Sequence, residues 1–375
     1  MKAIEPIDEF SGKSRFEELD ALRALAAIGV IAWHYTHAFN ASPFAHLLAP
    51  FYGRGLLMVD FFFVLSGFVI ARAFWTERRA TAFVDNARAR LARMYPLHLV
   101  MLLVVVLLQA VLTLGFRVPA SAQNDAYHFI LNILLLNSSG LQHGFSFNAP
   151  SWSISTEFLI NLLFLGCITL PGRMAKPLLA VIGIVCLATM AHRGVINGTR
   201  AFGWIDNDLI RTCAGFLTGV LLERVHARLV PLRRHAAWDL VLLICVAAIL
   251  RYLALGPYNN ASEMAICYVG FPLVIASAVR SQWVASVLRA KPLVYLGSIS
   301  YSIYLVHYPL MLALTVSDVA GHKPSYANPW FFLAFVATVL MVASVTYRLV
   351  ELPGKRWLGA RGRRTISGPA TATAD

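Results

Sequence analysis

Residues 55–74 read GLLMVDFFFVLSGFVIARAF, a run of 20 residues with only two charged side chains, Asp60 and Arg72. A helix of about 20 apolar residues is needed to cross the roughly 30 Å hydrocarbon core of a bilayer. A carboxylate such as Asp60 is costly near lipid and needs a partner or a water-filled cavity. The segment therefore predicts a transmembrane helix that carries a polar group with a function.

The composition of the whole chain places it among membrane proteins. Hydrophobic residues make up 58% of the 375 residues and charged residues only 14%, whereas soluble domains average about 45–50% and about 25%. The net charge of +13 does not indicate a nucleic-acid binder, because Lys and Arg lie in short loops and form no continuous stripe. The five cysteines lie in or beside apolar runs without metal-ligand spacing, so neither a disulfide nor a metal site is expected.

Ten apolar segments predict transmembrane helices, although several are shorter than the ~20 residues expected for a span. They cover residues 19–39, 55–74, 94–115, 152–170, 177–191, 208–223, 237–255, 264–280, 293–316 and 329–349. Residues 127–137 are apolar but too short to cross, and they predict an interfacial or re-entrant helix. The predicted fold class is an all-α polytopic membrane protein with about ten transmembrane helices.

The basic residues predict the orientation of these helices. They concentrate in every second loop, and such loops face the cytoplasm. Ten crossings with both termini in the cytoplasm satisfy this bias. We expect a cytoplasmic segment at residues 1–15, one membrane domain at 16–357, and a disordered cytoplasmic tail at 358–375.

The first predicted helix carries two titratable side chains, Arg23 and His34. They are eleven positions apart, which is three helical turns plus about 20°, so both should point from one face with a rise of ~16 Å between them. Arg23 should lie about one turn inside the inner interface and His34 toward the outer half. The less specific interpretation is a histidine that packs helices together and an arginine that reaches lipid phosphates.

Several further polar groups are predicted at the depth of His34. Asp60 enters with the second helix and Glu157 with the fourth. In the ninth helix, Tyr301, Tyr304 and His307 follow one face at spacings of three. The two carboxylates favour a functional site, because a carboxylate near lipid needs a partner or a water-filled cavity.

Five motifs together resemble the acyltransferase-3 family of integral-membrane O-acyltransferases, which modify bacterial surface sugars and related acceptors. The motifs are LDALRALA at 19–26 followed by Trp33 and His34, VDFFFVLSGFVI at 59–70, RARLARMYP at 88–96, SWSISTE at 151–157, and SYSIYLVHYP at 300–309. They occur in the family's order and cover the chain from about residue 16 to 357. Each motif alone is weak, whereas five in order on a ten-helix background are specific.

The resemblance implies transfer of an acyl group, usually acetyl, from cytoplasmic acyl-CoA to an acceptor hydroxyl at the outer face of the bacterial inner membrane. Membrane lipid, acyl-CoA and a carbohydrate acceptor are then the expected partners, with no nucleic acid and no tightly bound cofactor. The sequence leaves open the acceptor, the acyl chain length, the oligomeric state and the need for a soluble partner domain.

A donor-binding role is predicted for the basic residues near the inner face. Guanidinium groups pair with phosphate bidentately, so the anionic head of acyl-CoA would dock on Arg72, Arg88, Arg90 and Arg93, with Arg23 at the cavity mouth. The alternative interpretation is that these arginines only set the orientation of the chain in the membrane.

His34 is the predicted general base, because an imidazole suits proton transfer near neutral pH. Asp60 or Glu157 would orient its ring and stabilise the imidazolium. A covalent acyl-imidazole at His34 is the alternative mechanism. Ser66 or Ser153 is disfavoured as a nucleophile, because neither lies in a nucleophile elbow.

The acceptor side is predicted from aromatic and polar residues near the outer level. Candidates for acceptor contacts or oxyanion donors are Trp152, Ser153, Tyr301, Tyr304 and His307. Aromatic rings near an interface also serve as membrane anchors. The alternative function is a secondary transporter, against which stands the absence of internal repeats and of paired broken helices; a sensor or scaffold without chemistry is a third.

Overall fold

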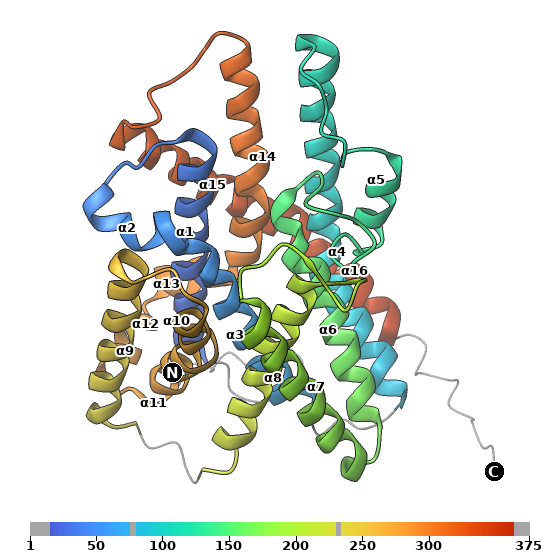
Figure 1. Cartoon of the computed structure of the whole chain (residues 1–375), viewed down its shortest axis with the longest axis vertical. Coiled ribbons are helices and arrows are strands. Elements are labelled where there is room, and N and C mark those ends of the chain that lie inside the picture. The colour runs from blue at the N-terminus through green and yellow to red at the C-terminus, as the bar shows by residue number, and fades with distance from the viewer. Residues whose placement is uncertain (1–15, 76–79, 230–233, 364–375) are drawn as a thin grey trace, which may run out of the picture.

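The computed structural model describes residues 16–75, 80–229 and 234–363. The described part is a helical bundle with one β-hairpin, whose two strands have two residues each (Figure 1). Its elements in chain order are α1 (Glu17–Phe39), α2 (Ala45–Arg54), η1 (Gly55–Leu57), α3 (Met58–Phe74), α4 (Ala80–Ala110), η2 (Val111–Gly115), α5 (Ala126–Ile133), η3 (Ala149–Ser151), α6 (Trp152–Thr169), α7 (Gly172–Arg193), β1 (Arg200–Ala201), β2 (Ile205–Asp206), α8 (Asn207–His226), α9 (Ala236–Leu255), α10 (Asn260–Ala265), η4 (Ile266–Gly270), α11 (Phe271–Arg280), α12 (Trp283–Leu288), α13 (Lys291–Ser298), α14 (Ser300–Val319), α15 (Pro329–Thr346), η5 (Tyr347–Glu351) and α16 (Leu352–Arg363).

All ten predicted segments are helical, and the protein is a multi-pass, all-α membrane protein. Within the described residues, eight helices are long and apolar enough to cross a bilayer. The remaining two predicted segments, 19–39 and 208–223, are helices α1 and α8, with 23 and 20 residues. Charged side chains interrupt the apolar stretches of both helices, and neither is among the eight spans, so the count of ten crossings stays a prediction.

Several predicted boundaries differ from the structure: α4 begins at Ala80, before the predicted segment 94–115, and the predicted segment 293–316 is interrupted at Ile299 between α13 and α14. The short apolar stretch 127–137 forms a helix only as far as the end of α5 at Ile133. Helix α16 continues to Arg363, so helix covers residues 358–363, where the sequence predicted a disordered tail. Residues 364–375 and the predicted N-terminal segment 1–15 lie outside the described residues.

Contacts between helix ends place the loops on two opposite sides of the bundle. On one side, Glu18 at the start of α1 accepts hydrogen bonds from Arg234 and Arg289, each at 3.0 Å. On the other side, Asn260 accepts a hydrogen bond from the backbone N–H of Val195 at 3.0 Å. Successive long helices run in opposite directions (Figure 1).

Helices α3 and α8 form a very close helix pair, because small residues line both faces of the contact. A Cβ atom on Gly67 of α3 would lie 1.9 Å from the carbonyl oxygen of Phe216, and one on Gly219 of α8 would lie 1.9 Å from that of Val64. Gly215 lies one turn before Gly219 and faces α3 as well. Small residues four apart let membrane helices approach closely, so these glycines fix the distance between α3 and α8.

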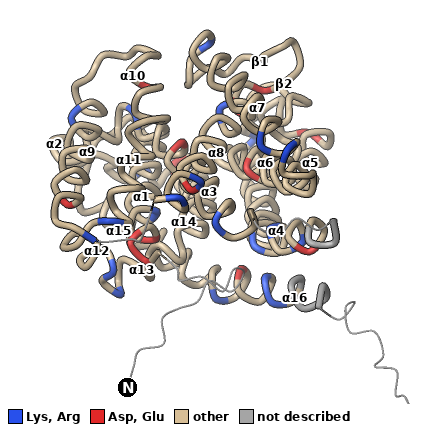
Figure 2. Tube along the Cα trace, turned by 90° about the horizontal axis from the view of Figure 1, so that it is seen from below, with Lys and Arg blue, Asp and Glu red and all other residues tan. Residues whose placement is uncertain are grey.

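Helix α1 lies in the interior of the bundle. It contacts α2, α3, α11, α12, α13 and α14, and its buried residues belong to the main apolar core. Charged side chains also occur inside the bundle, where Figure 2 shows acidic and basic residues around α3 and α8. At the periphery, α16 packs against α4.

The glycine contact between α3 and α8 can be tested with Gly219→Ala. The added methyl has no room beside the backbone of Val64, and overpacking of this kind costs about 1–3 kcal/mol or more. We expect a lower melting temperature in detergent and less inserted protein. Gly166→Ala in α6 is the matched control, because its Cβ would approach only the ring of Phe83, at 3.9 Å. Equal melting temperatures for the two variants would contradict the role of the glycines.

Candidate active site

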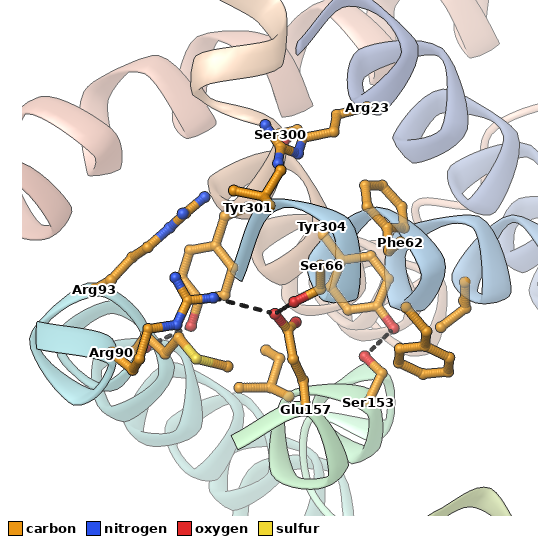
Figure 3. A pocket seen from close by; sticks show the side chains of 15 residues that line it. Arg23, Phe62, Ser66, Arg90, Arg93, Ser153, Glu157, Ser300, Tyr301 and Tyr304 are labelled. Carbon is orange, nitrogen blue, oxygen red and sulfur yellow. Dashed lines mark hydrogen bonds and ion pairs between the residues drawn. The ribbon is translucent and has the colours of Figure 1, made fainter. Parts of the chain in front are cut away.

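A polar pocket opens between α1, α3, α4, α6 and α14 (Figure 3). It is lined by Arg23, Val59, Phe62, Phe63, Ser66, Val69, Arg90, Arg93, Met94, Ser153, Ile154, Glu157, Ser300, Tyr301 and Tyr304. Five helices that are far apart in the sequence thus place three arginines and one carboxylate around one space. Six of the residues predicted for the site besides Arg23 line it: Arg90, Arg93, Ser153, Glu157, Tyr301 and Tyr304.

Glu157 is held in the pocket by two neighbours. The hydroxyl of Ser66 donates a hydrogen bond of 2.7 Å to its carboxylate, and the guanidinium of Arg90 lies 3.7 Å away. Figure 3 shows these three side chains meeting at the pocket wall formed by α3, α4 and α6. Glu157 therefore faces the arginines of the pocket, and no contact joins it to His34 in the described part of the chain.

The other two arginines differ in their surroundings. Arg23 pairs with Asp20 one turn earlier on α1, at 2.6 Å. No carboxylate lies within 4.0 Å of the Arg93 guanidinium among the described residues. Arg93 thus brings positive charge to the pocket and forms no direct ion pair within the described residues, an arrangement that suits an anionic ligand.

Two tyrosines of α14 are anchored to backbone carbonyl groups. The hydroxyl of Tyr301 donates to the carbonyl of Met94. That of Tyr304 donates to the carbonyl of Pro150 at 2.9 Å and accepts a hydrogen bond of 2.8 Å from Ser153. Both O–H donors are therefore in use, and an oxyanion contact from either would require one of these bonds to break.

His34 contacts a second histidine, His307. The Nδ1 atom of His34 lies 3.0 Å from the carbonyl oxygen of Val30 and 3.3 Å from Nε2 of His307. A carbonyl oxygen can only accept, so the proton of a neutral His34 ring belongs on Nδ1, and Nε2 carries the free lone pair. Tyr304 lies between the pocket and the histidine pair. It lines the pocket, and its ring centroid is 5.8 Å from that of His307.

The predicted common face of Arg23 and His34 agrees with these contacts. Arg23 lines the pocket together with Ser300, at the start of α14. His34 contacts His307, two turns further along the same helix. Both side chains therefore face α14, at two levels of the bundle.

Asp60 has a different partner from the one the sequence suggested. Its two oxygens accept hydrogen bonds from Nε and Nη2 of Arg211 on α8, at 2.9 and 2.5 Å. Both residues are completely buried, and Asp208 adds a second carboxylate 3.6 Å from Arg211. The ring of Trp152 lies 5.5 Å from the Arg211 guanidinium. Asp60 and Trp152 thus belong to a buried ionic cluster, and neither lines the pocket.

The remaining basic residues of the predicted donor site lie apart from the pocket. Arg72 stacks on the ring of Phe16, at 4.4 Å. Arg88 is exposed on α4. The structure therefore divides the predicted cluster, because Arg90 and Arg93 line the pocket and Arg72 and Arg88 do not.

Sequence reasoning missed Arg211 as the partner of Asp60. The signal was present, because Arg211 is an arginine inside the apolar segment 208–223, where a charge needs a partner. Ser66 was considered only as a nucleophile, whereas it donates a hydrogen bond to Glu157. Within the described residues, no group of three or more His, Cys, Asp or Glu side chains could hold a metal ion.

A family profile described as an acyltransferase domain matches residues 16–348. The chain belongs to this acyltransferase family. The match contains the whole pocket, His34 and His307. It identifies the protein as an acyltransferase and confirms the resemblance found in the sequence motifs. The transporter and scaffold alternatives are thereby set aside.

Similar curated proteins carry related names. The acyltransferase MdmB of Streptomyces mycarofaciens is 28% identical over 96% of this chain and 96% of its own length. The O-acetyltransferase OatA of Staphylococcus aureus and the peptidoglycan O-acetyltransferase OatA of Listeria monocytogenes are each 25% identical over 89% of this chain. The chain spans 56% and 55% of the length of these two proteins. No solved structure matches the chain.

The pairing of Asp60 with Arg211 in this acyltransferase makes a prediction for stability. Removing one partner leaves a buried charge, which costs about 3–5 kcal/mol, whereas removing both can be nearly neutral. We expect Asp60→Asn and Arg211→Met each to lower the melting temperature strongly, and the double variant to recover part of the loss, because Asp208 still lacks its partner Arg211.

The activity of that double variant separates two roles for Asp60. If the carboxylate only holds α3 to α8, acyl transfer should return together with the melting temperature. Recovered stability without recovered acyl transfer would instead show that Asp60 takes part in the chemistry.

Proposed function

We propose that this acyltransferase moves an acyl group, with acetyl favoured, from cytoplasmic acyl-CoA to a hydroxyl of an extracytoplasmic or lipid-linked carbohydrate at the bacterial inner membrane. The observation that carries the proposal is the placement of an arginine-lined pocket and a histidine pair on the two sides of Tyr304. The names of both OatA relatives support acetyl as the group, and the name of the Listeria protein supports peptidoglycan as a class of acceptor.

The pocket provides the donor site in this proposal. Arg93 forms no ion pair within 4.0 Å in the described structure, and Arg23 and Arg90 stand at neighbouring points of the lining. Phosphate groups of the CoA head would pair with these guanidinium groups. The pantetheine arm would then extend past Tyr304 toward His34, since Arg23 and His34 are separated by a rise of ~16 Å along α1.

His34 provides the base. Its Nε2 atom takes the proton of the acceptor hydroxyl as the hydroxyl oxygen bonds to the thioester carbonyl carbon. The carbon–sulfur bond then breaks, and the imidazolium returns the proton to the leaving thiolate, giving an ester and free CoA thiol. The alternative is a covalent acyl-imidazole, in which His34 itself attacks the thioester.

Arg93→Ala tests the donor site. Loss of a charge-assisted hydrogen bond costs about 1.5–3 kcal/mol, so CoA should bind at least about 10-fold more weakly. Binding can be measured without an acceptor, as the rise in melting temperature that CoA causes in purified protein. Arg88→Ala should weaken binding much less, because Arg88 is exposed on the same helix. Equal losses would favour a surface cluster over the pocket.

His34→Ala tests the base. Turnover of radiolabelled acetyl-CoA by membranes that contain a glycan acceptor should fall by ~10²–10⁴-fold, with normal protein levels and an unchanged response of the melting temperature to CoA. If wild-type protein given acetyl-CoA without acceptor accumulates label and the His34 variant does not, the covalent mechanism replaces the general-base mechanism. Near-normal turnover of His34→Ala would contradict both the general-base and the covalent mechanism.

A further inference from the structure

The histidine base lacks the carboxylate partner that such bases usually have. Glu157 is bound by Ser66 and faces Arg90 in the pocket, and Asp60 is bound by Arg211. Within the described residues, no aspartate or glutamate contacts His34. The ring that does contact it is His307, whose Nε2 atom lies 3.3 Å from Nδ1 of His34.

The proton positions of the two rings follow from their neighbours. Because Val30 can only accept, the His34 proton is on Nδ1. A second N–H on the facing Nε2 atom of His307 would point at this N–H group, so Nε2 of His307 carries a lone pair. The proton of His307 then lies on its Nδ1 atom, which is buried near the backbone carbonyl groups of Ile303 and Tyr304 but outside good hydrogen-bond geometry.

This arrangement is costly for His307. A buried donor whose nearest acceptors are poorly aligned loses part of the about 1–3 kcal/mol that a fully lost hydrogen bond costs, and such groups in native structures call for an explanation. The explanation that fits here is that the protein needs the lone pair on Nε2 of His307, the atom that faces His34. His307 is fully buried, and its helix α14 is anchored by the hydroxyl contacts of Tyr301 and Tyr304.

We propose that His307 is a positioning residue for the base: its Nε2 atom shares the Nδ1–H of His34 with the carbonyl of Val30, helps to keep the lone pair of His34 on Nε2, and stabilises the imidazolium during proton transfer. This inference rests on the proposed function, in which His34 is the base. No atom is transferred to or from His307. Its task is the one that a carboxylate performs in a Ser–His–Asp triad.

A neutral hydrogen-bond acceptor for His34 suits the location of the two histidines inside the bundle. A carboxylate beside His34 would draw a permanent ion pair into the membrane interior, where desolvation of two charges is expensive. An imidazole that accepts the hydrogen bond leaves the resting histidine pair uncharged. Positive charge then appears only while His34 holds the proton taken from the hydroxyl of the acyl acceptor. The half-buried His34 can then meet the acceptor while His307 stays shielded.

The test compares His307→Gln with His307→Leu. Gln can place a carbonyl oxygen near the position of Nε2 and accept the same hydrogen bond, whereas Leu fills similar space without an acceptor. We expect His307→Leu to lower kcat at least about 10-fold with an unchanged KM for acetyl-CoA, and His307→Gln to recover most of that loss. The double variant His34→Ala/His307→Leu should be no slower than His34→Ala, because a positioning residue acts only through the base.

His37 supplies a matched control. Its Nδ1 atom lies 2.8 Å from the carbonyl of Trp33, the same backbone contact that His34 makes one turn earlier. His37 is exposed and no second histidine ring contacts it in the described structure. His37→Leu should therefore leave kcat unchanged.

Three results would overturn the positioning role. They are wild-type turnover in His307→Leu, equal losses in the Gln and Leu variants, and losses that add to that of His34→Ala. Each can occur while His34→Ala alone is inactive, in which case the proposed function stands and only the role of His307 fails. Wild-type turnover in His34→Ala would instead remove the proposed function itself.

Discussion

The buried ion pair between Asp60 and Arg211 is the interaction on which the rest of the structure depends. It joins α3 to α8 at a point where neither side chain reaches solvent, and the glycines at 67, 215 and 219 allow the two backbones to approach. Helix α8 is in turn hydrogen-bonded to α6, because the hydroxyl of Thr212 donates a hydrogen bond of 2.8 Å to that of Thr156. Since α3 and α6 supply two walls of the pocket, the ion pair sets the shape of the site without lining it.

Two helices, α1 and α14, connect the two levels of the site. Each contributes to both levels: α1 supplies Arg23 to the pocket and His34 to the histidine pair, and α14 supplies Ser300, Tyr301 and Tyr304 to the pocket and His307 to the pair. Such a layout suits a reaction whose charged donor and hydroxyl acceptor arrive from opposite faces of a membrane. Tyr304 lies where the two levels meet, and its hydroxyl is bonded to Pro150 at the start of α6.

Much of the fold could be predicted from the sequence, because apolar segments and their length are local properties. Helical periodicity also predicted that Arg23 and His34 share a face. The partner of Asp60 could not be predicted, since Arg211 is 151 residues away and periodicity does not show which helices are neighbours. For the same reason the sequence paired His34 with a carboxylate, although it placed His307 at the right depth.

The basic cluster of α4 shows a second limit. Arg88 and Arg90 are two positions apart, which is about 200° around a helix, so only one of them can face the pocket. The sequence gives the angle between them but not the direction of the bundle interior. That direction comes from packing against α6 and α14.

The most direct measurement is an experimental structure of the protein bound to a non-hydrolysable acetyl-CoA analogue, in which a methylene group separates the carbonyl from sulfur. We expect phosphate groups beside Arg93 in the pocket, and the carbonyl carbon past Tyr304, close enough to His34 Nε2 for an acceptor oxygen to lie about 3–3.5 Å from that carbon. An analogue bound outside the arginine pocket, or one whose carbonyl stays remote from the His34–His307 pair, would contradict this expectation.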